Sequence, residues 1–202
     1  MDNVCYAARF GQYERRKIGV FGGSFDPVHE GHIHLATLAK EAVELDEVWF
    51  LPCGVSPHKM ETPPSDGALR AHWLRIAIAG LPWAKVSDIE LTAEGPSYSY
   101  LTLRRLSEKY PANDWYWIMG GDQWTALPRW KNSETIAKLA SFIVLARDGV
   151  AIDPRPGYRL HTVTGEHPAS ATAIRAALAA GEKDIPYLDK DVASAIRSKT
   201  SY

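Results

Sequence analysis

The stretch that decides the fold is Ile18-Gly-Val-Phe-Gly-Gly-Ser-Phe-Asp-Pro-Val-His-Glu-Gly-His32. Its apolar run from Ile18 to Phe21 stops at two glycines, as a buried parallel strand does before a tight turn. Two histidines three residues apart follow, and an amphipathic helix begins beside them. Backbone N–H groups at such a helix start, together with the helix dipole, favour an anion such as a polyphosphate.

Strands and helices alternate after this stretch. Apolar positions from Leu35 to Val43 recur at three- and four-residue spacing, which predicts a helix with one buried face. Similar patterns predict helices over 67–80, 97–110, 124–127, 133–139, 171–180 and 190–198, and strands over 47–51, 84–87, 115–119, 142–146 and 161–163. Ser97 and Ser133 are expected to cap the helices that begin with them.

This alternation indicates a single α/β domain, Rossmann-like and doubly wound, with a mainly parallel sheet. We expect the domain to occupy residues 17–202 and residues 1–16, which are polar and mixed, to be an N-terminal extension. The first strand, helix and second strand should form a right-handed crossover.

The composition is that of an ordinary globular protein. The chain has 202 residues, of which 46% are hydrophobic and 23% charged, and its net charge is −1. No global field therefore points to nucleic acid or an anionic membrane. The two cysteines, Cys5 and Cys53, supply neither a disulfide framework nor a metal motif. With no apolar leader and no membrane-length window, we expect a cytoplasmic protein without a nucleic-acid or membrane partner.

The quoted stretch also carries groups suited to phosphate chemistry. Gly22 and Gly23 let the backbone approach a ligand closely, and Ser24 offers a hydroxyl. His29 and His32 can face one side at the carboxyl end of the strand. From the residues alone, they are either satisfied structural histidines, a zinc pair, or donors to developing phosphoryl charge.

Residues 22–32 resemble the GG[ST]FDPxHxGH signature of the HxGH nucleotidylyltransferases, and the chain after residue 16 most resembles their nicotinate-mononucleotide adenylyltransferase branch. Four further segments match that branch in the same order: Pro57-His58-Lys59, residues 96–103, Gly120-Gly121-Asp122 followed by residues 127–130, and residues 170–175. Each motif is weak alone, but their ordered combination is specific.

This resemblance implies transfer of the adenylyl group of ATP to nicotinate mononucleotide, with release of pyrophosphate, in NAD biosynthesis. The phosphate of the mononucleotide attacks the α-phosphorus of ATP directly. Catalysis then needs positioning and charge stabilisation rather than a protein nucleophile. Mg²⁺ is expected as the ion carried by the ATP phosphates, with no metal site of the protein's own.

The resemblance also implies roles by motif position. Catalytic residues are expected to be His29, His32, Lys59 and Arg175, with His32 at the α-phosphoryl group. The residues implied to bind ATP are Gly22, Gly23, Ser24, Phe25, His29, His32, Gly120, Asp122, Ser170, Thr172 and Arg175. The residues implied to bind the mononucleotide are Ser24, Lys59, Ser99 and Trp130, with Trp130 stacked on the pyridine ring.

The nearest alternative is a sister adenylyltransferase that acts on nicotinamide mononucleotide or pantetheine phosphate. Residues 97–103 and Trp130 favour the pyridine-nucleotide branch over pantetheine phosphate. The residues do not decide between the nicotinate and nicotinamide forms, or between a monomer and a homo-oligomer.

Two alternatives belong to other classes. A nucleotide-binding regulator that has lost activity would not need an intact pair of histidines together with Lys59 and Arg175. A metallohydrolase would use the histidine pair with His58 or His72 and would hold zinc tightly.

Overall fold

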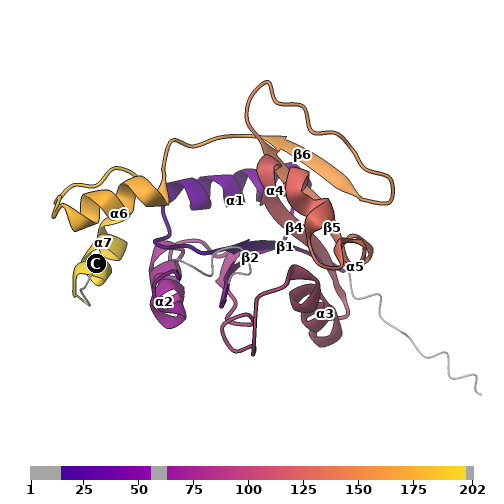
Figure 1. Ribbon diagram of the computed structural model, residues 1–202, viewed down its shortest axis with the longest axis horizontal. Helices are drawn as coiled ribbons and strands as arrows, with labels where there is room; N and C mark the ends of the chain where they lie inside the picture. The colour runs from indigo at the N-terminus through magenta and orange to yellow at the C-terminus, as the bar shows by residue number, and fades with distance from the viewer. Residues whose placement is uncertain (1–14, 56–62, 199–202) are drawn as a thin grey trace, which may run out of the picture.

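The computed structural model describes residues 15–55 and 63–198, which form a six-stranded parallel sheet with helices on both faces (Figure 1). The strands are β1 (Arg16–Gly23), β2 (Glu47–Pro52), β3 (Ala84–Val86), β4 (Asn113–Gly120), β5 (Ala140–Ala146) and β6 (Leu160–Thr164). The helices are α1 (Glu30–Val43), α2 (Gly67–Ala77), α3 (Ser99–Lys109), α4 (Gly121–Ala126), α5 (Ser133–Leu139), α6 (Ala171–Ala179) and α7 (Lys190–Ser198), with a 3₁₀ turn η1 (Leu127–Arg129).

The order of the strands is β3-β2-β1-β4-β5-β6, and every neighbouring pair is parallel. This order is that of a doubly wound sheet, so the expected Rossmann-like α/β fold is confirmed. The chain reverses its direction of winding between β1 and β4, and their carboxyl ends lie side by side there. Residues 1–14 of the expected N-terminal extension lie outside the described residues.

Alternating side chains of the strands divide the core into two layers. On one face Phe21, Val48 and Phe50 pack with buried residues of α1, α2 and α7. On the other face Val20 and Trp49 pack with buried residues of α3 and α5. Figure 1 shows α1 and α3 on opposite sides of the sheet, and α6 and α7 together at one end. None of the helices in the described ranges is long and apolar enough to cross a membrane.

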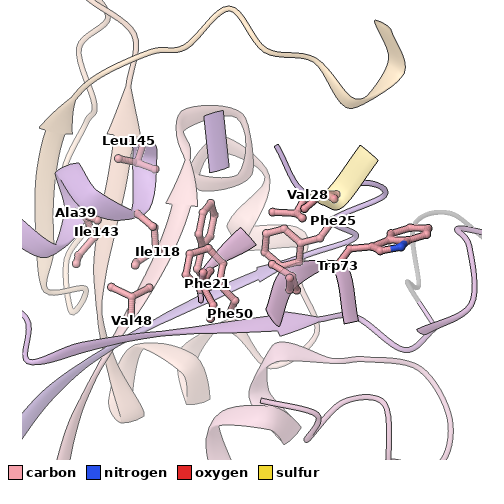
Figure 2. Packing of buried hydrophobic residues seen from close by; sticks show 14 of the residues in the cluster. Phe21, Phe25, Val28, Ala39, Val48, Phe50, Trp73, Ile118, Ile143 and Leu145 are labelled. Carbon is pink, nitrogen blue, oxygen red and sulfur yellow. The ribbon is translucent and has the colours of Figure 1, made fainter. Parts of the chain in front are cut away.

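The turn between β1 and α1 is held by an aromatic side chain in an unusual backbone conformation. Phe25 has a φ of 50°, in the left-handed region that non-glycine residues rarely adopt, and its side chain is only 2% exposed. The centroid of its ring lies 5.7 Å from that of Phe21 and 5.9 Å from that of Phe50. Figure 2 shows these three rings together in the core. This packing stabilises the strained turn.

A buried arginine also stabilises the β1–α1 turn, through hydrogen bonds to backbone carbonyls. Arg70 of α2 is 1% exposed, and its guanidinium donates three hydrogen bonds to backbone carbonyls. The acceptors are the carbonyl oxygens of Ser65, Ser24 and Cys53, each 2.7 Å away. Arg70 therefore joins the β1–α1 turn, the end of β2 and the segment that leads into α2.

The predicted boundaries of α2, α3, α4 and α5 were wrong. The helix predicted over 124–127 is α4, which begins earlier, at Gly121. The N-cap of α3 is Tyr98, because the hydroxyl oxygen of Ser97 accepts a hydrogen bond from the Gly54 N–H, 3.0 Å away, instead of capping the helix. The N-cap of α5 is Asn132, with Ser133 as the first helical residue. The helix predicted over 67–80 ends at Ala77. Local helix propensity takes no account of a distant partner such as Gly54, which binds the Ser97 hydroxyl.

We expect Arg70→Met to lower the free energy of unfolding by about 3–5 kcal/mol, because buried carbonyls would lose a charged donor while the apolar stem is retained. Urea denaturation measures the loss. Arg75→Met is the matched control, because Arg75 lies on the same helix but forms an exposed ion pair with Asp88. That control should cost less than about 1 kcal/mol. Equal losses for the two variants would show that the Arg70 bonds contribute little.

Candidate active site

A pocket of about 450 Å³ opens at the carboxyl ends of β1 and β2, beside the point where the winding reverses. In open parallel sheets this is the position where ligands bind. Ser24, Ser99 and Trp130 all line this pocket, which we call the Trp130 pocket. The structure thus brings together three residues predicted to bind the mononucleotide. The fourth, Lys59, lies outside the described residues.

The two predicted histidines form a stacked pair at the start of α1. His29 is the N-cap and His32 lies in the first turn, and their ring centroids are 3.7 Å apart with 24° between the planes. The backbone N–H of His29 donates to Nδ1 of His32 over 3.2 Å. Phe25, which is also predicted to bind ATP, packs edge-on against His32, with 4.9 Å between the ring centroids. The pair is therefore fixed by packing before any substrate binds.

Burial keeps both histidines uncharged at neutral pH. Desolvation, with a smaller contribution from His167, lowers the pKa of His29 to about 4. Desolvation, with a smaller contribution from His29, lowers the pKa of His32 to about 3. Because Nδ1 of neutral His32 accepts a hydrogen bond, its single proton lies on Nε2. His32 is thus a neutral hydrogen-bond donor with a defined tautomer.

The C-terminal signature reaches the same turn. Nη1 of Arg175 donates to the carbonyl oxygen of Asp26 over 2.7 Å, and Nη2 donates to the hydroxyl of Thr172 over 3.3 Å. Ser170 is the N-cap of α6. The fold therefore places the predicted residues Ser170, Thr172 and Arg175 close to the predicted phosphate-binding turn.

Gly31 explains how the two helix starts can come together. A Cβ on Gly31 would lie 3.1 Å from the His29 ring and 3.2 Å from the Cβ of Ala169. Contacts this short would push the histidine ring or the segment before α6 away. Glycine at this position therefore permits the N-termini of α1 and α6 to approach one another, which concentrates backbone N–H groups suited to anions.

Two further predicted ATP-binding residues lie at the carboxyl end of β4. Gly120 is the N-cap of α4, and Asp122 lies exposed in its first turn. Neither lines the Trp130 pocket, although Gln123 beside them does. Since β4 pairs with β1, both lie at the same edge of the sheet as the predicted turn.

Glu90 is a residue of the site that sequence reasoning missed. It is 6% exposed, lines the Trp130 pocket, and accepts a hydrogen bond from the Thr102 hydroxyl over 2.7 Å. Desolvation raises the pKa of Glu90, while hydrogen bonds from Thr102 and Ser97 partly oppose that rise. Glu90 and Ser97 thereby hold the segment that carries Ser99. A single acidic residue before a glycine turn gives no sequence signal for this role.

Arg70 was also missed, although its spacing offered a signal. Arg70 lies three and four residues before Trp73 and Leu74, which are both buried. That spacing places the arginine on the apolar face of α2. A charged residue there indicates a buried hydrogen-bonded group rather than a solvated one.

The zinc hypothesis can be compared with the described residues. Among residues 15–55 and 63–198, no three His, Cys, Asp or Glu side chains lie together as a metal site. His72 is exposed on α2, and His58 lies outside the described residues. Within the described part of the chain, the histidine pair therefore has no third ligand.

Comparisons with known proteins agree with the geometry. Residues 20–177 match the cytidylyltransferase-like family. A Bacillus mycoides protein described as a probable nicotinate-nucleotide adenylyltransferase is 45% identical over 73% of this chain and 74% of its own length. A Bacillus licheniformis protein with the same description is 40% identical over 68% of this chain and 73% of its own length.

Among solved structures, the fold is similar to that of Plasmodium falciparum nicotinic acid mononucleotide adenylyltransferase complexed with NaAD. The TM-score is 0.72 at 19% identity, over 92% of this chain and 96% of that chain. The likeness supports the fold, and the sequence matches support the family. The chain belongs to the cytidylyltransferase-like family and, within it, to the nicotinate-nucleotide adenylyltransferases.

Proposed function

We propose that the protein transfers the adenylyl group of ATP to nicotinate mononucleotide, giving nicotinate adenine dinucleotide and pyrophosphate. The observation that carries this proposal is the stacked pair of neutral histidines at the β1–α1 turn, beside Arg175 and the Trp130 pocket. The family relationship supplies the reaction, and the described side chains supply groups for each part of it.

In this proposal the ATP phosphates lie at the starts of α1 and α6. Backbone N–H groups of the two helices and the Arg175 guanidinium would bind the phosphate oxygens. Nε2–H of His32 would donate to an oxygen of the α-phosphoryl group, where charge builds up in the transition state. His29 and Ser24 would help to hold the triphosphate.

The mononucleotide would occupy the Trp130 pocket, with its pyridine ring stacked on Trp130 and its phosphate near Ser24. An oxygen of that phosphate attacks the α-phosphorus, a new P–O bond forms, and the bond to the β-phosphate breaks as pyrophosphate leaves. Holding both substrates in line accounts for most of the rate enhancement. No protein side chain needs to form a covalent bond.

Mg²⁺ would enter with ATP. Because no cluster of three potential metal-binding side chains occurs in the described ranges, its ligands would be phosphate oxygens and water. The donors at the turn are N–H groups and a guanidinium, which fit a phosphate chain that carries its own ion. When bound, the ion neutralises phosphate charge.

A pyrophosphate-release assay tests the proposed function. The purified protein is offered ATP and Mg²⁺ with nicotinate mononucleotide, nicotinamide mononucleotide or phosphopantetheine. We expect the highest kcat/KM with nicotinate mononucleotide. Turnover only with phosphopantetheine, or with none of the acceptors, would contradict the proposal.

His32→Ala should reduce kcat by ~10²–10³-fold, as the loss of a donor to transition-state charge does. His72→Ala is the matched control, because His72 is exposed on α2 and away from the turn. It should retain wild-type kcat, whereas a metallohydrolase that used His72 as its third ligand would lose activity. Thermal melting of both variants checks the fold. A folded His32→Ala protein with near-normal kcat would refute the role of His32.

A further inference from the structure

The Trp130 pocket carries an excess of positive charge. Two cations, Arg129 and Lys131, line it, and Glu90 is its one acidic lining residue in the described part of the chain. The Glu90 carboxyl is buried and accepts hydrogen bonds from Thr102 and Ser97. The hydrogen bonds from Thr102 and Ser97 occupy the Glu90 carboxyl oxygens, so this group does not pair with Arg129 or Lys131. A ligand with a negative group would be favoured there.

Lys131 has a defined position in this pocket. Its Nζ lies 4.7 Å from the centroid of the Tyr98 ring, within the range of a cation–π interaction. Tyr98 directly precedes α3, whose first residue is Ser99, and Trp130 directly precedes Lys131. The ammonium group is thus held beside Tyr98, in the pocket that Ser99 and Trp130 also line.

Among the described residues, the charge of Lys131 also has no carboxylate partner. No carboxylate in the described ranges lies within 4.0 Å of its Nζ as an ion-pair partner. The cation–π contact with Tyr98 is weak in free energy at an exposed site, so its main effect is on the position of the side chain. Here the aromatic ring limits the freedom of a long side chain at the wall of a binding pocket.

We propose that Lys131 is a specificity residue that makes this pocket prefer a mononucleotide whose pyridine ring carries a carboxylate over one that carries a neutral carboxamide. The inference rests on the proposed function and extends it to the choice of substrate. The ammonium attracts the ring carboxylate, and the isosteric amide gains no comparable energy. Because Lys131 is exposed, solvent screens the attraction, and the effect is moderate and depends on salt.

Lys131→Met and Lys131→Arg test this inference. Values of kcat and KM are measured with nicotinate mononucleotide and with nicotinamide mononucleotide, at low and high ionic strength. For Lys131→Met we expect kcat/KM for the nicotinate form to fall about 3- to 10-fold, mostly through KM, and that for the amide to change less than about twofold. Lys131→Arg should keep the wild-type preference, since the charge is retained.

Lys138→Met is the matched control, because Lys138 is an exposed lysine of α5 that does not line the Trp130 pocket. It should leave the ratio of the two kcat/KM values unchanged. The wild-type ratio should also decrease at high salt, and the ratio of Lys131→Met should be nearly independent of salt.

The other outcomes separate the two levels of the proposal. If Lys131→Met lowers kcat/KM equally for both mononucleotides, Lys131 binds their common phosphate or supports the pocket, and the specificity role is overturned. An unchanged ratio overturns it as well. If the wild-type protein does not use nicotinate mononucleotide at all, the proposed function itself fails, and the specificity role fails with it.

Discussion

The site depends on the hydrogen bonds of one buried arginine. Arg70 binds carbonyl oxygens of Ser24, Cys53 and Ser65, which belong to segments far apart in the sequence. Ser24 and Cys53 form one wall of the Trp130 pocket, and Ser24 begins the turn that leads to the histidines. A charged donor in the interior is costly unless its hydrogen bonds are satisfied, so these segments are stable only together.

With the turn held in this way, the histidine pair is fixed before substrate binds. Stacking on His29 and contact with Phe25 leave His32 only partly exposed, and the hydrogen bond from the His29 N–H fixes its tautomer. A neutral donor held in this way needs no reorganisation when charge appears on the α-phosphoryl group. The packing of the aromatic rings thus fixes the direction of the His32 Nε2–H group.

Regular structure followed from local patterns. The apolar runs that end in glycine or proline became β1 and β2, and the amphipathic spacing after Gly31 became α1. Even the weak strand predicted over 161–163 is part of β6. Such patterns are visible in sequence because burial repeats with the period of the element.

The polar contacts between loops could not be predicted in the same way. Ser97 looks like a helix cap, but its hydroxyl binds Gly54 and Glu90, and nothing local distinguishes the two outcomes. The resemblance implied a role for Arg175 at the phosphates, but its bond to the Asp26 carbonyl depends on how α6 docks. Tertiary partners of single polar groups carry no periodic signal.

The central claim is that His32 acts as a hydrogen-bond donor in a direct transfer and not as a nucleophile. Its Nδ1 accepts a backbone N–H and its Nε2 carries the proton, so neither nitrogen offers a free lone pair. The most direct test is the stereochemical course with ATP that is chiral, through sulfur, at the α-phosphorus. A single in-line displacement predicts inversion of configuration in the dinucleotide. Retention would indicate an adenylylated enzyme intermediate and would contradict the account.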